Sequence, residues 1–198
     1  GGQTSSTVSG EILKSALLAI SIALLCMLIY IIIRFELLSG IAAVIALFHD
    51  VLIMFCCMGI FHIEINSTFI AALITILGYS INNTIIIFDR IRENIKFYTN
   101  KRIDGKLVKP AYIANKSVQE TIWRTINTTL TTLIMIAMVA IIGVRDIQIF
   151  ALPIIFGLLA GTYSSVFLAP TIWAMLAKSF PGTIKAPKAK RTAAKAGK

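Results

Sequence analysis

Charged side chains are scarce in this sequence. Only 14% of its 198 residues are charged, whereas 57% are hydrophobic. A soluble domain of this size carries about a quarter charged residues. Apolar runs of about 18 residues or more recur along the chain, and each is long enough to cross a bilayer. The composition excludes an ordinary soluble domain and predicts a multi-pass membrane protein.

Residue types that usually carry catalysis or bind metals are also few. The only histidines are His49 and His62, and the three cysteines, Cys26, Cys56 and Cys57, have no CxxC spacing. We interpret the cysteines as packing residues in apolar segments. The HExxH, GxSxG, P-loop and dinucleotide-binding motifs are absent from the sequence. We therefore expect a protein that is not an enzyme and needs neither a cofactor nor a metal.

The apolar runs predict an all-α, polytopic membrane helical bundle. The predicted spans are residues 12–33, 38–61, 67–88, 121–144 and 147–176. Loops 34–37 and 62–66 are short, so the helices that they join should be antiparallel neighbours. The last span is long, and we expect it to be tilted, or bent at Pro153 or Pro170.

The distribution of basic residues predicts the orientation. Nine of the 19 Lys and Arg residues lie between Arg90 and Arg124, and seven more follow Trp173. Positive residues stay on the cytoplasmic side, so both regions should be cytoplasmic. The tail can attract anionic lipid headgroups, whereas its lack of aromatic residues argues against nucleic acid. The predicted parts are a polar exterior lead-in (1–10), a five-span domain (11–178) with a cytoplasmic loop at about 89–120, and a basic tail (179–198).

The long cytoplasmic loop has predicted structure of its own. Residues 89–98 should continue the third span as a helix, and residues 100–106 should form a turn. Residues 111–120 can form an amphipathic helix that leads into the fourth span and lies along the headgroup surface.

One acidic side chain lies near the middle of the second predicted span, in the pair His49-Asp50. An ionised Asp at the bilayer centre costs about 2.5–3.5 kcal/mol, so it should face the bundle interior. Two interpretations stay open. Asp50 is either a proton or ion site, or a structural residue that pins one helix to another through hydrogen bonds.

The third span carries polar residues Asn82, Asn83 and Thr84, and Asp89 follows at its end. Asn cannot titrate, so Asn83 is either a hydrogen-bond relay or a group that holds helices together. Arg124 opens the fourth span. In an antiparallel pair it can reach the depth of Asn83, or its side chain can extend to the headgroups.

The fourth span is rich in threonine. Thr125, Thr128 and Thr132 should share one face at helical spacing. With Arg124 they could line a hydrated pathway, or they could bond to the backbone of their own helix.

Small residues recur in the last span. Gly157 and Gly161 form a GxxxG pair, which Ser165 and Ala169 extend on the same face. Such residues let helices approach closely, so this face predicts tight packing and says nothing of a substrate.

The run from Gly78 to Asn94 resembles the SecF family, the membrane subunit of the bacterial SecD–SecF complex in the resistance-nodulation-division superfamily. Four shorter matches are Gly10-Glu11, Arg34-Phe35-Glu36, His49-Asp50 and Arg124-Thr125, so that the resemblance covers roughly residues 5–178. That family has six spans, with an exterior domain between the first two. The chain is similar to the last five spans, and the first span and exterior domain are absent, cleaved or outside this sequence.

The resemblance implies half of a pseudo-symmetric transmembrane domain in the bacterial cytoplasmic membrane, with the C-terminus cytoplasmic. Its partners would be SecD as the other half, the SecYEG translocon, an unfolded preprotein and membrane lipids. Its function would be to aid protein export with a proton or sodium gradient. The alternatives are a non-conducting scaffold for the translocon and an exporter of lipids or small molecules from the same superfamily.

The resemblance also implies an ion relay at Asn83 and Arg124, at the interface between the halves, with Asp50 behind them. The supporting polar residues would be Asn82, Thr84, Thr128 and Asp89. The family has an acid where this chain has Asn83. Three explanations stay open: an engineered substitution, a natural variant that uses another acid such as Asp50 or one on SecD, or a loss of ion coupling.

Overall fold

The computed structural model describes residues 37–61, 67–98, 102–103 and 106–180, together with short helical pieces between residues 11 and 30. The predicted lead-in (1–10) lies outside the described residues, as does the tail beyond residue 180.

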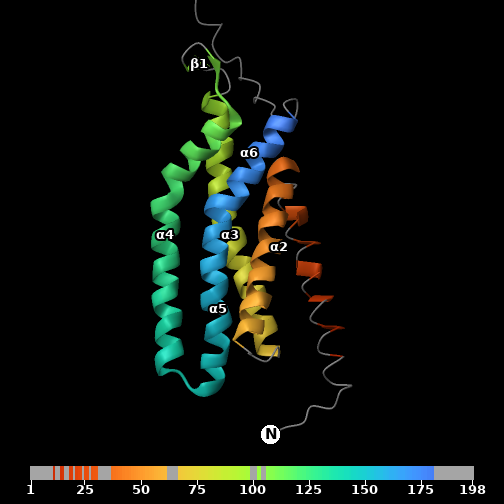
Figure 1. Cartoon of the computed structure of the whole chain (residues 1–198), viewed down its shortest axis with the longest axis vertical. Helices are drawn as coiled ribbons and strands as arrows, with labels where there is room; N and C mark the ends of the chain where they lie inside the picture. The colour runs from red at the N-terminus through yellow and green to blue at the C-terminus, as the bar shows by residue number, and fades with distance from the viewer. Residues whose placement is uncertain are drawn as a thin grey trace, which may run out of the picture.

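The described chain is a bundle of long upright helices (Figure 1). Four of its helical segments are long and apolar enough to cross a membrane. The prediction of an all-helical membrane bundle is therefore confirmed. The elements are α2 (Leu37–Ile60), α3 (Ser67–Tyr98), β1 (Arg102–Ile103), β2 (Lys106–Leu107), α4 (Pro110–Ile142), α5 (Arg145–Tyr163), a π-helical turn η1 (Ser164–Leu168) and α6 (Ala169–Ser179).

The first predicted span, residues 12–33, lies partly outside the described residues. The pieces that are described between residues 11 and 30, drawn in red in Figure 1, are helical. Their large apolar side chains are exposed, Leu18 to 64% and Leu25 to 57%.

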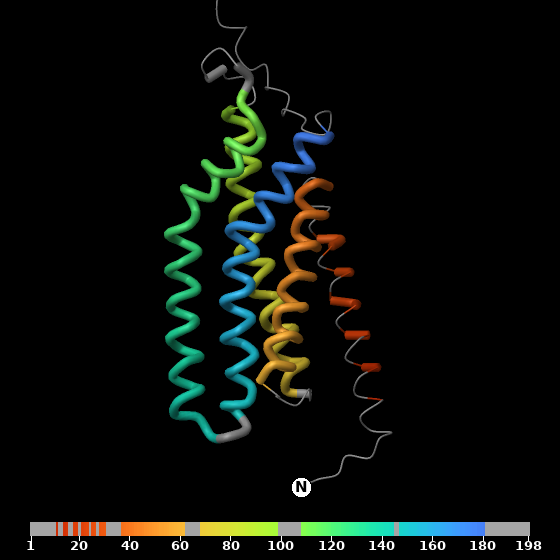
Figure 2. The backbone as a smooth tube through the Cα atoms, viewed as in Figure 1, coloured from red at the N-terminus to blue at the C-terminus, as the bar shows by residue number. Residues whose placement is uncertain are grey.

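Helix α5 lies at the centre of the bundle, because it contacts α2, α3 and α4 (Figure 2). A row of small residues on α2, Ala42, Ala43 and Ala46, is fully buried. Small side chains let backbones approach closely where no water drives helices together. The apolar part of α4 is mostly exposed: only 11% of it is buried.

Helices occupy most of the predicted cytoplasmic loop between the third and fourth spans, as the sequence indicated. Helix α3 continues to Tyr98, as predicted, and β1 and β2 form a small antiparallel hairpin. The predicted interfacial helix 111–120 and the fourth span form one continuous helix, α4. Pro110 stands at its first turn, where a missing N–H costs nothing. We call this end of the bundle the hairpin end.

The last span is interrupted at η1 rather than at Pro153, which lies inside α5. The N–H of Ala169 bonds to the carbonyl of Ser164, five residues back. Pro170 follows at the start of α6 and has no N–H to donate. Single π-helical turns are frequent at functional sites.

Candidate functional site

Asp50 of α2 is the centre of a buried polar group in the middle of the bundle. Its side chain is fully buried, and so are Ser80 of α3 and Ser164 of η1. The Ser80 hydroxyl donates to Oδ2 of Asp50 at 2.5 Å, and the Ser164 hydroxyl lies beside the same carboxyl group and donates to the carbonyl of Gly161 at 3.2 Å. Oδ1 of Asp50 lies 3.3 Å from Nδ1 of His49. We call these four residues the Asp50 centre.

A glycine makes room for this arrangement. A Cβ added at Gly161 of α5 would lie 3.0 Å from Cβ of Ser80 and 3.6 Å from Oδ2 of Asp50. The close approach brings the end of α5 against the carboxyl group, and the π turn begins at Ser164, three residues later. The hydroxyl of Ser80 and the ring of His49 thus converge on one buried acid, with Ser164 beside it.

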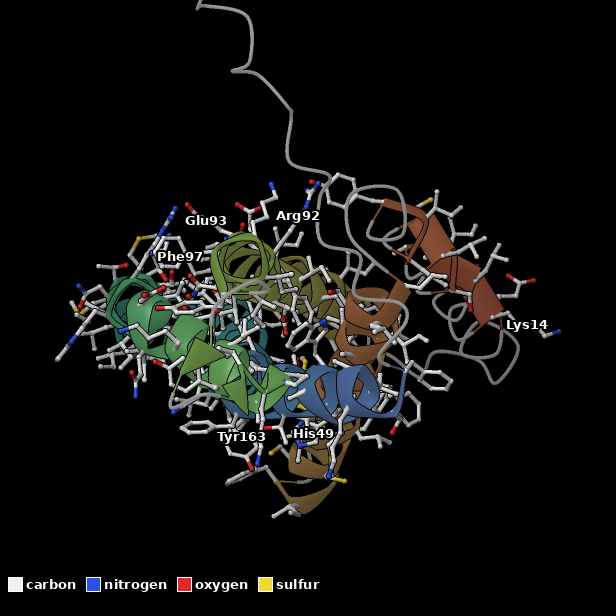
Figure 3. The ribbon with its side chains drawn as sticks, turned by 90° about the horizontal axis from the view of Figure 1, so that it is seen from above. Lys14, His49, Arg92, Glu93, Phe97 and Tyr163 are labelled. Carbon is white, nitrogen blue, oxygen red and sulfur yellow. The ribbon has the colours of Figure 1, made fainter. Side chains whose placement is uncertain are left out.

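His49 connects this centre to the surface of the chain. Its side chain is 32% exposed, while that of Asp50 is 1% exposed. The His49 ring lies 6.0 Å from the ring of Tyr163, which is itself 56% exposed. Figure 3 shows both side chains on one side of the bundle, opposite Arg92 and Glu93.

A second chain of hydrogen bonds joins α3, α4 and α5. The Tyr79 hydroxyl donates to Oγ1 of Thr129 at 3.1 Å, and Thr129 shares a 2.9 Å hydrogen bond with Thr162. Sequence reasoning missed Tyr79 and Thr162. The position of Tyr79, one residue before Ser80 in the polar motif, was the available signal.

Asn83 and Thr125 form a further polar layer, one turn closer to the hairpin end. Asn83 is 1% exposed and Thr125 is fully buried. Asn83 lies four residues after Tyr79 on α3, and Thr125 lies four residues before Thr129 on the antiparallel helix α4. Because Tyr79 and Thr129 are hydrogen-bonded, Asn83 and Thr125 lie at the same height in the bundle. Neither polar atom of the Asn83 amide, nor Oγ1 of Thr125, has a hydrogen-bond partner among the described residues. Such groups are rare in native structures and mark positions that need an explanation.

The structure corrects the expectation that Asn83 faces a partner half. This chain's own helices cover Asn83, whereas Arg124 is exposed. Asn83 lies one turn along α3 from Tyr79, whose hydroxyl points to α4, so it takes an inward position. Thr84 is buried and donates to the carbonyl of Ser80. Three other predicted residues, Asn82, Asp89 and Thr128, are exposed.

The threonine face predicted on α4 is also wrong in part. The buried face consists of Thr121, Thr125 and Thr129, at spacings of four. Thr128 is exposed and Thr132 is half-buried, and both donate to carbonyls of their own helix, which confirms the second of the two predicted alternatives for these residues. A helical pattern fixes which residues share a face only approximately, and the packing of α4 against α3 and α5 selects the actual one.

A polar cluster at the hairpin end joins α3 to α4. Arg90 donates to Glu120 at 2.7 Å and to Glu93 at 2.5 Å. The buried Asn94 amide donates to Ser117 and to Glu120, both at 2.9 Å. We expect Asn94→Ala to destabilise the α3–α4 pair by about 1–3 kcal/mol, because it leaves buried Ser117 without this partner. Unfolding in mixed detergent micelles measures this cost.

The matched control is Arg90→Ala at the same level of α3. Arg90 belongs to the exposed part of the cluster, where ion pairs contribute about 0–1 kcal/mol. Equal losses for the two variants would contradict the assignment of stability to the buried amide.

The described residues contain no group of three or more His, Cys, Asp or Glu side chains that could hold a metal ion. That no metal or cofactor is needed stays a prediction.

The family model for the C-terminal region of the protein export membrane proteins SecD and SecF matches residues 3–179. The chain belongs to the SecD/SecF family. It is 43% identical to the protein translocase subunit SecF of Cereibacter sphaeroides over 82% of this chain and 48% of the relative. It is 41% identical to the protein translocase subunit SecDF of Bacillus subtilis over 83% of this chain and 22% of the relative.

A solved structure supports the same conclusion. The chain matches the crystal structure of SecDF, a translocon-associated membrane protein from Thermus thermophilus, with a TM-score of 0.76 and 33% sequence identity. The match covers 88% of this chain and 23% of that protein. The chain thus spans about half the length of its SecF relative and less than a quarter of the SecDF proteins.

Proposed function

We propose that this chain is the membrane part of an auxiliary subunit of the Sec translocon, which uses an ion gradient to aid protein export across the bacterial cytoplasmic membrane. The observation that carries the proposal is the Asp50 centre. A fully buried acid, which accepts a hydrogen bond from a serine hydroxyl of the neighbouring helix α3, stands in the middle of an apolar bundle of the SecD/SecF family.

The chemistry of this centre suits a group that gains and loses a proton. An ionised carboxylate inside a membrane bundle is costly unless hydrogen bonds compensate it. Ser80 donates to the charged form, and its hydroxyl can rotate to accept from the neutral form. Each change of charge would therefore rearrange the contacts of α2 with α3 and η1. Because the helices are rigid, this rearrangement of contacts can be transmitted to other parts of the bundle.

The partners of the whole protein follow from the same proposal. SecD would supply the other half of a pseudo-symmetric domain and cover the exposed apolar surface of α4. SecYEG would deliver an unfolded preprotein, and lipids would surround the assembly. The hairpin end and the C-terminus would be cytoplasmic, because basic residues collect in both regions.

One observation favours a different function, a non-conducting scaffold for the translocon. Asn83 stands where the family resemblance implies an acid, and an amide cannot carry a proton. Proton flux separates the two functions. The experiment uses the complete protein with its SecD partner in lipid vesicles that contain a pH-sensitive dye. A wild-type rate equal to that of empty vesicles would favour the scaffold.

Two substitutions at position 83 test its part in the relay. We expect Asn83→Ala to retain flux, because Asp50 carries the titratable group. We expect Asn83→Asp to increase the flux, because it restores an acid in the layer that contains unpaired Thr125. Loss of flux in Asn83→Ala, with assembly intact, would show that the amide is needed as a relay and would contradict this assignment.

A further inference from the structure

The Asp50 centre has one route to the surface that the proposed relay does not use. The predicted relay residues Asn83 and Arg124 are on α3 and α4, whereas His49 is on α2 and its ring lies 6.0 Å from that of Tyr163 of α5. His49 is the half-buried member of a pair whose other member is fully buried. Imidazole is the side chain best suited to exchange protons near neutral pH.

We propose that His49 passes protons between buried Asp50 and the face of the bundle that carries Tyr163. This inference rests on the proposed function and deepens it, because it names the proton as the ion and His49 as the group through which it enters and leaves. The pair has the geometry for this transfer, since Nδ1 of His49 and Oδ1 of Asp50 are 3.3 Å apart.

The transfer balances within the pair. In the starting state Asp50 is ionised, and neutral His49 carries its proton on Nδ1. A hydronium ion at the exposed face gives a proton to Nε2, which forms an imidazolium and leaves a water molecule. The N–H bond at Nδ1 then breaks as an O–H bond forms at Oδ1 of Asp50. Neutral His49 is left with its proton on Nε2, and the reverse sequence releases the proton.

The surroundings of the pair contain few competing groups. From α3 the Asp50 carboxyl meets the Ser80 hydroxyl, and from η1 it meets the Ser164 hydroxyl. From α5 it meets the Gly161 backbone, and His49 meets the Tyr163 phenol. Among the contacts given for the described residues, no lysine, arginine or second carboxylate reaches Asp50. Among the described residues, His49 is therefore the contact of Asp50 that can take up its proton and present it at an exposed face.

A polar, partly exposed His49 in an apolar helix costs free energy, and a purely structural role does not explain why the chain has it. It stands beside Asp50 in the middle of a 24-residue apolar helix, and a third of it is exposed. Polar side chains at this depth face a cavity or a partner rather than acyl chains. An apolar or amide side chain at position 49 would pack against Asp50 without placing an exposed imidazole on this face. The exposed ring is explained if water or a polar partner reaches this face.

The test follows proton exchange at Asp50 directly. The complete protein with its SecD partner is placed in lipid nanodiscs, and the infrared carbonyl band of protonated Asp50 is identified by its loss in Asp50→Asn. After transfer to deuterated buffer, the rate at which this band shifts measures proton exchange. We expect His49→Gln to slow the exchange by about 100-fold, the size of effect typical of a lost general acid–base group. The matched control is His62→Gln, the chain's other histidine, which should leave the rate unchanged.

Chemical rescue separates proton transfer from a structural role. In His49→Ala, added imidazole should restore fast exchange at Asp50, whereas a variant that is merely misfolded would not respond to it. Unchanged exchange in His49→Gln, or a slow rate in His49→Ala that imidazole does not restore, would overturn the inference. The readout is independent of export: if the wild-type protein carries no flux, the proposed function fails, while His49-dependent exchange at Asp50 is still measured.

Discussion

Replacing Gly157 with alanine is expected to destabilise the bundle by about 1–3 kcal/mol, the cost typical of overpacking a well-packed core. A Cβ at this position would lie 2.6 Å from Cγ1 and 2.7 Å from Cγ2 of Ile76, and 3.0 Å from Sδ of Met54. Ile76 and Met54 are both 1% exposed. The atoms in conflict include both γ carbons of a β-branched side chain, which is stiff at χ1 and has little freedom to move aside.

Gly78→Ala is the matched control for this prediction. A Cβ at Gly78 meets no atom within 4 Å, and alanine favours helix over glycine. Its stability should be unchanged or slightly higher. Thermal unfolding of the purified protein in detergent compares the two variants. An equal response would show that the contact of α5 with α2 and α3 is looser than the structure indicates.

Replacing Asp50 with asparagine is expected to reduce gradient-driven proton flux by at least about 100-fold, the lower part of the range for loss of an acid–base group. The amide has nearly the shape of the acid, so Ser80 keeps an oxygen to which it donates. What the variant loses is the proton that the acid can release. Export that depends on the gradient should fall with the flux, whereas assembly with SecD should persist.

A carboxylate elsewhere in the chain provides the control for Asp50→Asn. Glu11→Gln removes one negative charge at an exposed position. Its flux should equal that of the wild type. A loss of flux in both variants would point to an effect of net charge rather than of the Asp50 centre.

Much of the fold follows from hydropathy. Long uncharged runs predict the helices, and the mixed pattern after Phe88 correctly predicts that α3 continues to Tyr98. The π turn at Ser164–Leu168 was not predictable, because the sequence there contains no break and Pro170 indicates only that a bend is possible.

Part of the candidate site could be predicted from the sequence. Asp50 is conspicuous because it is an acid within an apolar run. Ser80 and Ser164, which lie beside it, are not conspicuous in the sequence. A serine in a membrane helix is unremarkable until a neighbouring helix places a carboxylate opposite it. The inward position of Asn83 and the buried face of Thr121, Thr125 and Thr129 depend on how α3, α4 and α5 are rotated against each other. A single sequence leaves that rotation uncertain by about one residue.

The most direct test of the Asp50 centre is the initial rate of proton flux into vesicles that contain the complete protein and its SecD partner. Wild type, Asp50→Asn and Asn83→Ala are measured at equal protein density and with the same imposed gradient. A collapsed rate in Asp50→Asn together with a retained rate in Asn83→Ala is the predicted result. Full flux without the carboxyl group at position 50 would contradict the account.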